Sequence, residues 1–324
     1  MYLKNKKVFI AGGTGMTGTG IIGHILEHYS GTALRASYHN TEPFLRDNVE
    51  YVRGDLVAPQ DCASMLKGCD CAIMAAAYTA NASTIHATPL NFINENLLMN
   101  VNFLKACHLE NIKRVIFIGS ATVYQDFEGS IKEEMLDFNK DPNAAYYGLG
   151  WAGRFTEKLC SFLHGSYGME IIIVRAANIY GPYAKFDPKS SNFIPAIIRK
   201  AVDGDDPFEV WGRPEVTRDV IYVDDFAEAV VKMLDNDGIK FETFNVGTGE
   251  KTTVGDVVNW ALKHAGHTPS RVTYDDGKPT TMKFRSLDCT NAQNLLGWQP
   301  KIKAEEGIRR TVEWWKNNKG WWKR

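Results

Sequence analysis

The first half of the chain alternates short apolar runs with longer amphipathic stretches. The strand-length runs lie at 8–11, 33–38, 71–76, 115–118 and 170–175. Most of them lack the alternation of polar and apolar residues that is typical of a strand with one solvent-exposed face, so we expect strands buried on both faces. The helix-length stretches between them include 18–29, 92–110 and 145–165. This order predicts an α/β fold, a Rossmann-like doubly wound parallel sheet.

The overall composition excludes several classes of protein. The 324 residues carry 37 Lys and Arg against 38 Asp and Glu, a formal net charge of −1. General nucleic-acid binding needs an excess of cations, so we expect no nucleic-acid partner. No apolar stretch approaches the roughly 20 residues that span a bilayer, which predicts no stable membrane insertion. We expect a cytoplasmic protein, because the first seven residues lead directly into a strand and leave no room for a signal peptide.

The six cysteines form no CxxC pair and no zinc spacing. The histidines do not cluster with cysteines or carboxylates either, so we expect reduced thiols and no metal site.

Beyond residue 178, Pro and Gly turns interrupt the regular alternation. We expect residues 1–178 and about 217–248 to form one domain. The segments of about 179–216 and 249–324 would then form a smaller, discontinuous C-terminal α/β lobe that binds substrate.

A glycine-rich turn follows the first predicted strand and opens the first predicted helix. Its spacing is Gly12-x-x-Gly15-x-x-Gly18. In such a turn the first glycine allows a tight bend, the second lets backbone amides approach a pyrophosphate, and the third lets helix and strand pack closely. The position between a strand and a helix predicts dinucleotide binding.

The second strand suggests which dinucleotide binds. An acidic residue at its end would accept hydrogen bonds from a ribose hydroxyl and favour NAD, but none occurs before Glu42. Arg35, Ser37, His39 and nearby Arg53 could instead meet a 2′-phosphate, so NADP is slightly favoured over NAD. Asp55 and Leu56, after the third strand, are placed to border the adenine.

Several further motifs follow in a fixed order. They are Gly54-Asp55-Leu56, Ala75-Ala76-Ala77, Gly119-Ser120-Ala121-Thr122-Val123-Tyr124, Tyr147-Gly148-Leu149-Gly150, Asn178-Ile179-Tyr180-Gly181-Pro182 and Arg218-Asp219. In this order the whole chain resembles the extended short-chain dehydrogenase/reductase family, which contains nucleotide-sugar epimerases, dehydratases and reductases. Within that family, the stretch 178–196 is most similar to the GDP-L-fucose synthases.

The resemblance implies a role for each matching residue. Ser120 would hydrogen-bond the reacting sugar oxygen, and Tyr147 would exchange a proton with that oxygen during hydride transfer. The implied cofactor-binding residues are Gly12, Thr14, Gly15, Met16, Arg35, His39, Asp55, Leu56, Ala75, Ala76, Tyr147 and Ala177. The implied substrate-binding residues are Asn178, Asn192, Trp211, Arg218 and Arg285. The implied partners are a nucleotide-diphosphate sugar, GDP-linked by preference, and a second copy of the chain bound through two helices per subunit.

The sequence departs from the family at the catalytic tyrosine. A lysine normally follows four residues after it, but Trp151 stands there after Tyr147, and Gly150 stands there after Tyr146. An indole carries no charge and cannot lower the pKa of a tyrosine as an ammonium does. Arg154, seven residues after Tyr147, is a possible substitute cation.

The comparison with the fucose synthases shows two more departures. Thr122 stands in place of an active-site cysteine, and Asn192 with Phe193 stands in place of a histidine. Three interpretations remain open: a redox enzyme with a substitute cation, an enzyme that tolerates a weakly activated tyrosine, and a non-catalytic binding protein of the same fold.

Overall fold

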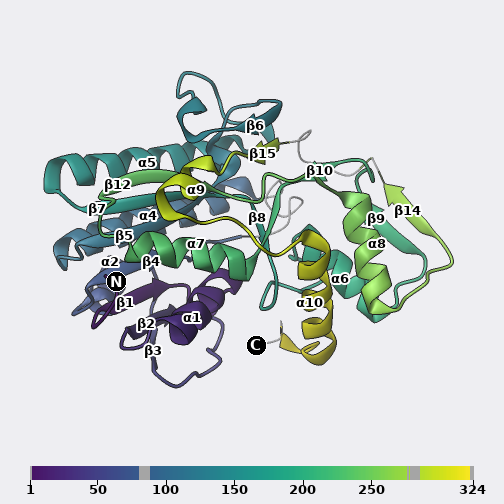
Figure 1. The fold of residues 1–324 in the computed structure, drawn as a ribbon, viewed down its shortest axis with the longest axis horizontal. Coiled ribbons are helices and arrows are strands. Elements are labelled where there is room, and N and C mark those ends of the chain that lie inside the picture. Colours follow the sequence, from purple (N-terminus) through teal and green to yellow (C-terminus); the bar gives the residue numbers. More distant parts are fainter. Residues whose placement is uncertain (1, 80–87, 276, 278–284, 322–324) are drawn as a thin grey trace.

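A computed structural model describes residues 2–79, 88–275, 277 and 285–321. Its centre is a parallel sheet of seven strands in the order β12-β7-β5-β4-β1-β2-β3. Their bounds are β1 (Lys7–Ala11), β2 (Ala33–Tyr38), β3 (Val49–Arg53), β4 (Cys71–Met74), β5 (Arg114–Ser120), β7 (Glu170–Ala176) and β12 (Phe241–Val246). The predicted doubly wound α/β fold is confirmed (Figure 1).

Helices cover both faces of this sheet. One face packs against α1 (Met16–His28), α7 (Val223–Asp235) and α9 (Thr290–Leu296). The other packs against α2 (Pro59–Leu66), α4 (Pro89–Leu109) and α5 (Tyr147–Tyr167). In β7, Ile172 and Val174 enter the first core while Ile171 and Ile173 enter the second. This burial on both sides explains the unbroken apolar run 171–174 within β7.

A smaller lobe has its own core, built from α6 (Phe193–Asp203), α8 (Val254–Ala265) and α10 (Ala304–Asn317). Two strands, β9 (Phe208–Trp211) and β14 (Val272–Asp275), pair in parallel at its outer end (Figure 1). Trp315 is buried in this core and stacks on Phe186 with ring centroids 4.1 Å apart.

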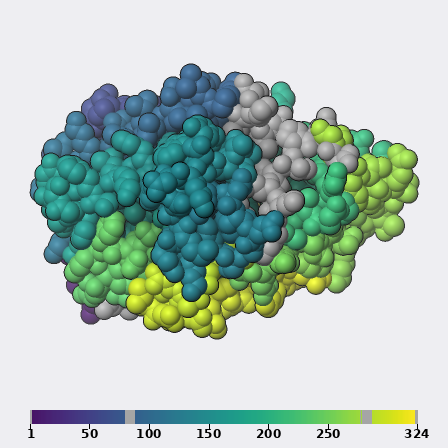
Figure 2. All heavy atoms as spheres, turned by 90° about the horizontal axis from the view of Figure 1, so that it is seen from above, coloured from purple at the N-terminus to yellow at the C-terminus, as the bar shows by residue number. Residues whose placement is uncertain are grey.

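Short strand pairs connect the lobes. They are β8 (Asn178–Tyr180) with β11 (Val220–Tyr222), β10 (Thr217–Arg218) with β13 (Thr252–Thr253), and β6 (Gly129–Ile131) with β15 (Arg285–Leu287). The described residues also form three single turns of 3-10 helix: η1 (Ala121–Val123), η2 (Glu133–Met135) and η3 (Ala144–Tyr146). The lobes lie directly against each other, and the yellow-green end at the right of the space-filling view belongs to the smaller lobe (Figure 2).

One segment sits in a different lobe from the predicted one. Ala292 of α9 and Trp298, both inside the range expected to belong to the smaller lobe, are buried in the core of the central sheet. The indole Nε1 of Trp298 donates to the carbonyl of Asp225 in α7 at 3.2 Å. The chain therefore returns to the first lobe before α10.

A buried arginine ties the bottom of the sheet to α7. Arg114, fully buried, pairs with Glu170 at 2.9 Å and donates to the carbonyls of Met233 and Leu234 at 2.9 Å each. These carbonyls belong to the last turn of α7, which has no further helical N–H groups to pair with them.

No helix among the described residues is long and apolar enough to cross a membrane. All six cysteines are unpaired, and five of them are buried.

Candidate active site

The glycine turn packs too tightly for side chains. Gly12 has φ +78°, and a Cβ there would lie 2.8 Å from the Cα of Ala76. A Cβ on Gly18 would lie 2.2 Å from the carbonyl oxygen of Gly12. The backbone of Gly12 is also fixed from β2, because its N–H donates to the Ser37 hydroxyl at 3.1 Å. The turn is thus a cradle of bare backbone at the carboxyl end of β1.

The N-terminus of α1 opens into this cradle. Gly15 is its N-cap, no side chain caps the helix, and its first turn holds no acidic residue. The free N–H groups and the positive end of the helix dipole favour an anion. The residues present therefore fit the pyrophosphate of a dinucleotide, with Thr14, Gly15 and Met16 around the helix start.

Arg35 does not take the place predicted for it. It stands opposite Glu50 in the β2–β3 register, and its Nε lies 2.9 Å from that carboxylate. Its Nη1 donates to the carbonyls of Met65 and Lys67 at 3.0 and 2.7 Å. The structure therefore does not support Arg35 as a 2′-phosphate ligand, because its guanidinium is held by Glu50 and the end of α2. His39 is exposed just beyond β2.

The predicted adenine border has an ordered backbone. The Asp55 carboxylate accepts the N–H of Val57 at 2.9 Å, and Leu56 is buried. Beyond β4, the N–H of Ala75 donates to the carbonyl of Ala11 at 3.2 Å. Ala75 and Ala76 thus lie beside the glycine turn.

Ser120 ends β5 at the same edge of the sheet. Its exposed hydroxyl accepts the N–H of Thr122 at 3.3 Å, which caps the single turn η1. Thr122 is half-buried in that turn. The serine oxygen keeps lone-pair and donor capacity for a substrate oxygen.

Tyr147 begins α5 and is 53% exposed. Trp151, one turn later, is half-buried and donates its indole N–H to the Asp141 carboxylate at 3.1 Å. The single donor of Trp151 is therefore used within the protein. Trp151 thus offers neither a charge nor a free N–H at the position where the resemblance predicts a lysine.

Arg154 lies beside Trp151. Its guanidinium carbon is 4.8 Å from the centre of the indole, and its Nε donates to the carbonyl of Val123 at 2.7 Å. A second nitrogen donates to the carbonyl of Lys140. The side chain is 1% exposed, and burial lowers the pKa of its guanidinium. Arg154 thus joins the turn after β5 to the loop before α5, and its charge is directed at backbone carbonyls.

The predicted substrate residues come from both lobes. The amide of Asn178 donates to the carbonyl of Asp219 at 2.9 Å, and the adjacent Arg218 donates to the carbonyl of Thr217 at 3.1 Å. Burial lowers the pKa of the Arg218 guanidinium. Ala177 is half-buried, its N–H bonded to the carbonyl of Val246 at 2.9 Å.

The remaining substrate candidates are placed less closely. Asn192 is exposed as the N-cap of α6, and Trp211 is 51% exposed at the end of β9. Arg285 has a described backbone in β15, whereas its side chain lies outside the described part of the structure.

Sequence reasoning gave Tyr146 no role. With Tyr147, Pro89 and Ile93 it lines a pocket of about 160 Å³ at the junction of α4 and α5. The pair of neighbouring tyrosines, Tyr146 and Tyr147, was the sequence feature that could have pointed to this role. The sequence does not show which of the two lies at the site, because it does not show where α5 begins.

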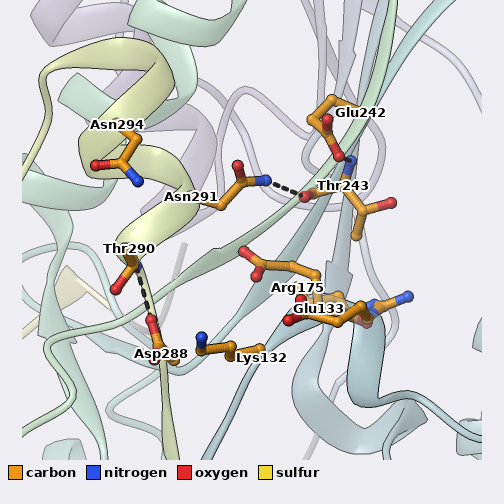
Figure 3. A pocket seen from close by; sticks show the side chains of 10 residues that line it. Lys132, Glu133, Arg175, Glu242, Thr243, Asp288, Thr290, Asn291 and Asn294 are labelled. Atoms are coloured by element: carbon orange, nitrogen blue, oxygen red, sulfur yellow. Dashed lines mark hydrogen bonds between the residues drawn. The ribbon is translucent and has the colours of Figure 1, made fainter.

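A larger pocket of about 450 Å³ lies at the β12 side of the sheet (Figure 3). It is lined by Lys132, Glu133, Glu134, Arg175, Glu242, Thr243, Asp288, Thr290, Asn291 and Asn294. None of the predicted site residues is among them. Arg175 is itself paired with Glu157 by two hydrogen bonds of 2.9 and 2.8 Å. We therefore assign this pocket no part in the chemistry. Within the described residues, no group of His, Cys, Asp and Glu could hold a metal ion.

Comparison with known proteins agrees with this geometry. The model of the NAD dependent epimerase/dehydratase family matches residues 8–247. The chain belongs to this family. It is of the extended short-chain dehydrogenase/reductase type, as the sequence motifs indicated. The protein is therefore an NAD(P)-dependent enzyme.

Its relatives in the family include proteins named for GDP-sugars. GDP-L-fucose synthase of Escherichia coli (strain K12) is 27% identical over 330 aligned residues, covering 98% of each chain. GDP-L-colitose synthase of Yersinia pseudotuberculosis is 30% identical over 244 residues, covering 72% of this chain and 78% of the relative. The structure of a Thermotoga maritima UDP-glucose 4-epimerase with UDP-glucose shares the fold, with a TM-score of 0.83 at 22% identity, covering 96% and 99% of the two chains.

Proposed function

We propose that this enzyme interconverts a hydroxyl and a keto group by oxidation and reduction. The reacting carbon would be C4 of the hexose in a GDP-sugar. The observation that carries the proposal is the bare glycine cradle at the uncapped start of α1, with Ser120 and the tyrosines of α5 at the same edge of the sheet. A phosphate-binding cradle and a hydroxyl pair are what hydride exchange on a sugar alcohol needs.

The chain's residues divide the work between the two partners. A nicotinamide dinucleotide, when bound, supplies or accepts the hydride. The backbone of Gly12 to Met16 would hold its pyrophosphate. Ser120 would hold the reacting sugar oxygen by a hydrogen bond, and a tyrosine at the start of α5 would exchange the proton. Asn178 and Arg218 would hold the nucleotide diphosphate, for which a guanidinium is well shaped.

The preference for GDP over other nucleotides rests on the names of the relatives, two of which are synthases of GDP-sugars. For the cofactor we propose NADP with only a small preference over NAD. No acidic residue ends β2, whereas exposed His39 remains near it and Arg35 is held by Glu50.

A second candidate function is favoured by Trp151. Because its indole N–H is bonded to Asp141, the usual cation of the site has no replacement at that position. The protein would then bind cofactor and nucleotide sugar and turn them over very slowly or not at all.

We also propose a homodimer built on α4 and α5. These helices expose Leu90, Leu98, Phe155 and Phe162, whose exposed fractions range from 47% to 64%. An exposed apolar surface of this kind on two neighbouring helices favours burial against a second copy.

The experiment is direct. Purified protein is scanned for nicotinamide absorbance at about 340 nm. It is then titrated with GDP-mannose and UDP-glucose, and the same absorbance is followed in time. If the protein binds the nicotinamide cofactor and a nucleotide sugar and the absorbance changes, the enzymatic function is supported. If it binds them without an absorbance change, the second candidate function is supported. If it binds neither the cofactor nor a nucleotide sugar, both functions are contradicted.

A further inference from the structure

The carboxylate of Asp219 is buried between the short strands that connect the two lobes. The residue lies between β10 and β11 and is 4% exposed. One carboxylate oxygen accepts the N–H of Thr248 at 2.9 Å and the hydroxyl of the same residue at 3.0 Å. The other accepts the N–H of Gly249 at 3.2 Å and the N–H of Leu287 at 2.9 Å. All four partners are neutral donors, and hydrogen bonds to a charged acceptor are stronger than those between neutral groups.

These four bonds join three segments that are distant in the sequence. Asp219 directly follows β10, Thr248 and Gly249 follow β12, and Leu287 is the last residue of β15. Three of the donors are backbone N–H groups, so the carboxylate fixes the course of the chain itself. The placement of β10 and β15 beside the end of β12 therefore depends on one side chain.

Three of the residues predicted to bind substrate lie next to this contact. Arg218 precedes Asp219 in the chain. The backbone N–H and the side-chain amide of Asn178 both donate to the Asp219 carbonyl, at 3.1 and 2.9 Å. On β15, Arg285 lies two residues before Leu287. Asp219 is thus bonded to, or adjacent to, each segment that carries one of the three.

The surroundings leave the carboxylate little room to move. A Cβ on Gly247 would lie 2.7 Å from the Oδ2 of Asp219 and 3.0 Å from the Cβ of Ala177. Burial raises the pKa of the Asp219 carboxyl, and its hydrogen bonds counter that rise. A side chain held in one place by packing and hydrogen bonds can support a binding site built on its neighbours.

We propose that Asp219 is a positioning residue for the nucleotide diphosphate: its carboxylate sets the relative positions of the segments that carry Asn178, Arg218 and Arg285. This inference rests on the proposed function. A guanidinium binds phosphate oxygens through a rigid planar fork, so a displaced backbone weakens the contact. Because Asp219 is buried, it acts through these neighbours. Its loss should therefore affect the binding of the diphosphate and not the binding of the dinucleotide cofactor.

The first test replaces the carboxylate by its amide. In Asp219→Asn one oxygen becomes an NH2 group, which faces backbone N–H donors and cannot accept a hydrogen bond from them. We expect the Kd for GDP, measured by calorimetry, to rise at least about tenfold, and the preference for GDP over GMP to shrink at least about fivefold. The Kd for NAD+ should change less than about threefold. An unchanged Kd for GDP, or an equal rise for GDP and GMP, overturns the proposal.

Asp225→Asn is the matched control. Asp225 is 3% exposed, and its carboxylate accepts the N–H groups of Lys301 and Ile302 at 3.0 and 2.8 Å. It resembles Asp219 in burial and bonding, but it holds the segment before α10 against α7. We expect this variant to lose stability in urea unfolding while its Kd for GDP stays within about threefold of the wild-type value. If Asp225→Asn weakens GDP binding as much as Asp219→Asn does, general loosening explains the effect and the proposal is wrong.

A milder pair of variants changes one of the four bonds and carries the test if Asp219→Asn does not fold. Thr248→Val removes the hydroxyl donor and keeps the backbone N–H, so we expect the Kd for GDP to rise at least about threefold. Thr248→Ser keeps the hydroxyl and should stay within about twofold of the wild-type value. Equal Kd values for GDP in the two variants would contradict the positioning role.

The wild-type protein separates this inference from the function on which it rests. If it binds neither GDP nor UDP, the proposed function is contradicted, and the role of Asp219 with it. If it binds UDP instead, UDP and UMP replace GDP and GMP with the same expected changes. If it binds GDP, and Asp219→Asn binds GDP equally well, the positioning role alone is contradicted.

Discussion

The guanidinium of Arg154 lies 4.8 Å from the centre of the Trp151 indole, while its Nε holds the carbonyl of Val123 in the turn that follows Ser120. Trp151, which stands where the resemblance predicts a lysine, is therefore packed into a structural contact. Its indole N–H is held by Asp141, on the loop that leads into α5. Arg154 and Trp151 together join the two loops that carry the candidate serine and tyrosines.

Restoring the family's lysine tests this relationship. We expect Trp151→Lys to raise turnover less than about threefold, because the Asp141 carboxylate that accepts the indole N–H would pair with the new ammonium. The variant should also lose stability by roughly 1 kcal/mol, since the cation–π contact with Arg154 is removed. Single-turnover rates and urea unfolding measure the two effects. A gain of a hundredfold would instead show that Tyr147 is the reacting tyrosine.

Cofactor binding should depend on the absence of a side chain at Gly18. In Gly18→Ala the new Cβ would meet the Gly12 carbonyl oxygen at 2.2 Å, so the turn must shift away from its cradle shape. We expect the Kd for NAD+ and NADP+ to rise about a hundredfold or more, measured by calorimetry. Gly165→Ala in α5 is the matched control, because nothing lies within 4 Å of its Cβ. If both variants bind the cofactor normally, the turn is not the phosphate site.

A preference for NADP should be small. With Arg35 paired to Glu50, His39 is left as the nearby residue that we assign to a 2′-phosphate. We expect NADP+ to bind tighter than NAD+ by less than about tenfold, and His39→Ala to abolish the difference. Calorimetric titration with both dinucleotides checks this, and a strong preference for NAD+ would contradict it.

Much of the fold, and less of the site, could be predicted from the sequence. The sheet was predictable because strands such as β7 are buried on both faces and therefore contain unbroken apolar runs. The pairing of Arg35 with Glu50 depends on the β2–β3 register, which the local sequence does not contain. Likewise, the short turn η3 sets where α5 begins, and with it which of the two tyrosines is half-buried (Tyr146) and which is exposed (Tyr147). The packing of α9 on the first lobe needs the buried Trp298, which composition cannot place.

The proposed dimer predicts a change of mass in solution. Phe155→Glu or Phe162→Glu puts a charge on the exposed apolar stripe of α5, so we expect a monomer in light scattering at micromolar concentration. Leu295→Glu on α9, a residue 47% exposed, is the control and should leave the dimer intact. A wild-type monomer would exclude this interface.

Low pH should weaken the buried ion pair between Arg114 and Glu170. Burial raises the pKa of Glu170, but hydrogen bonds from Lys240 and Arg114 outweigh it and leave the pKa below its usual value of 4.5. Its stabilisation is therefore present above about pH 4.5 and is lost as the pH falls through the folded-state pKa.

Replacing Glu170 measures this contribution. We expect Glu170→Gln to cost roughly 3–5 kcal/mol of unfolding free energy at neutral pH, because the buried charge of Arg114 loses its carboxylate partner, and to cost less at low pH. Denaturant unfolding at both pH values tests this. Glu305→Gln, whose exposed pair with Lys263 is solvated, should change stability far less. An equal cost at both pH values would contradict the sign of the shift.

The central claim is tested most directly by one rapid-mixing experiment. Protein loaded with NADP+ or NAD+ is mixed with a panel of GDP-sugars and UDP-sugars, and absorbance at about 340 nm is followed. The account predicts a transient or lasting rise with a GDP-sugar that disappears when both Tyr146 and Tyr147 are replaced by Phe, while both ligands still bind. Binding of the ligands with no absorbance change in the wild-type protein would contradict it.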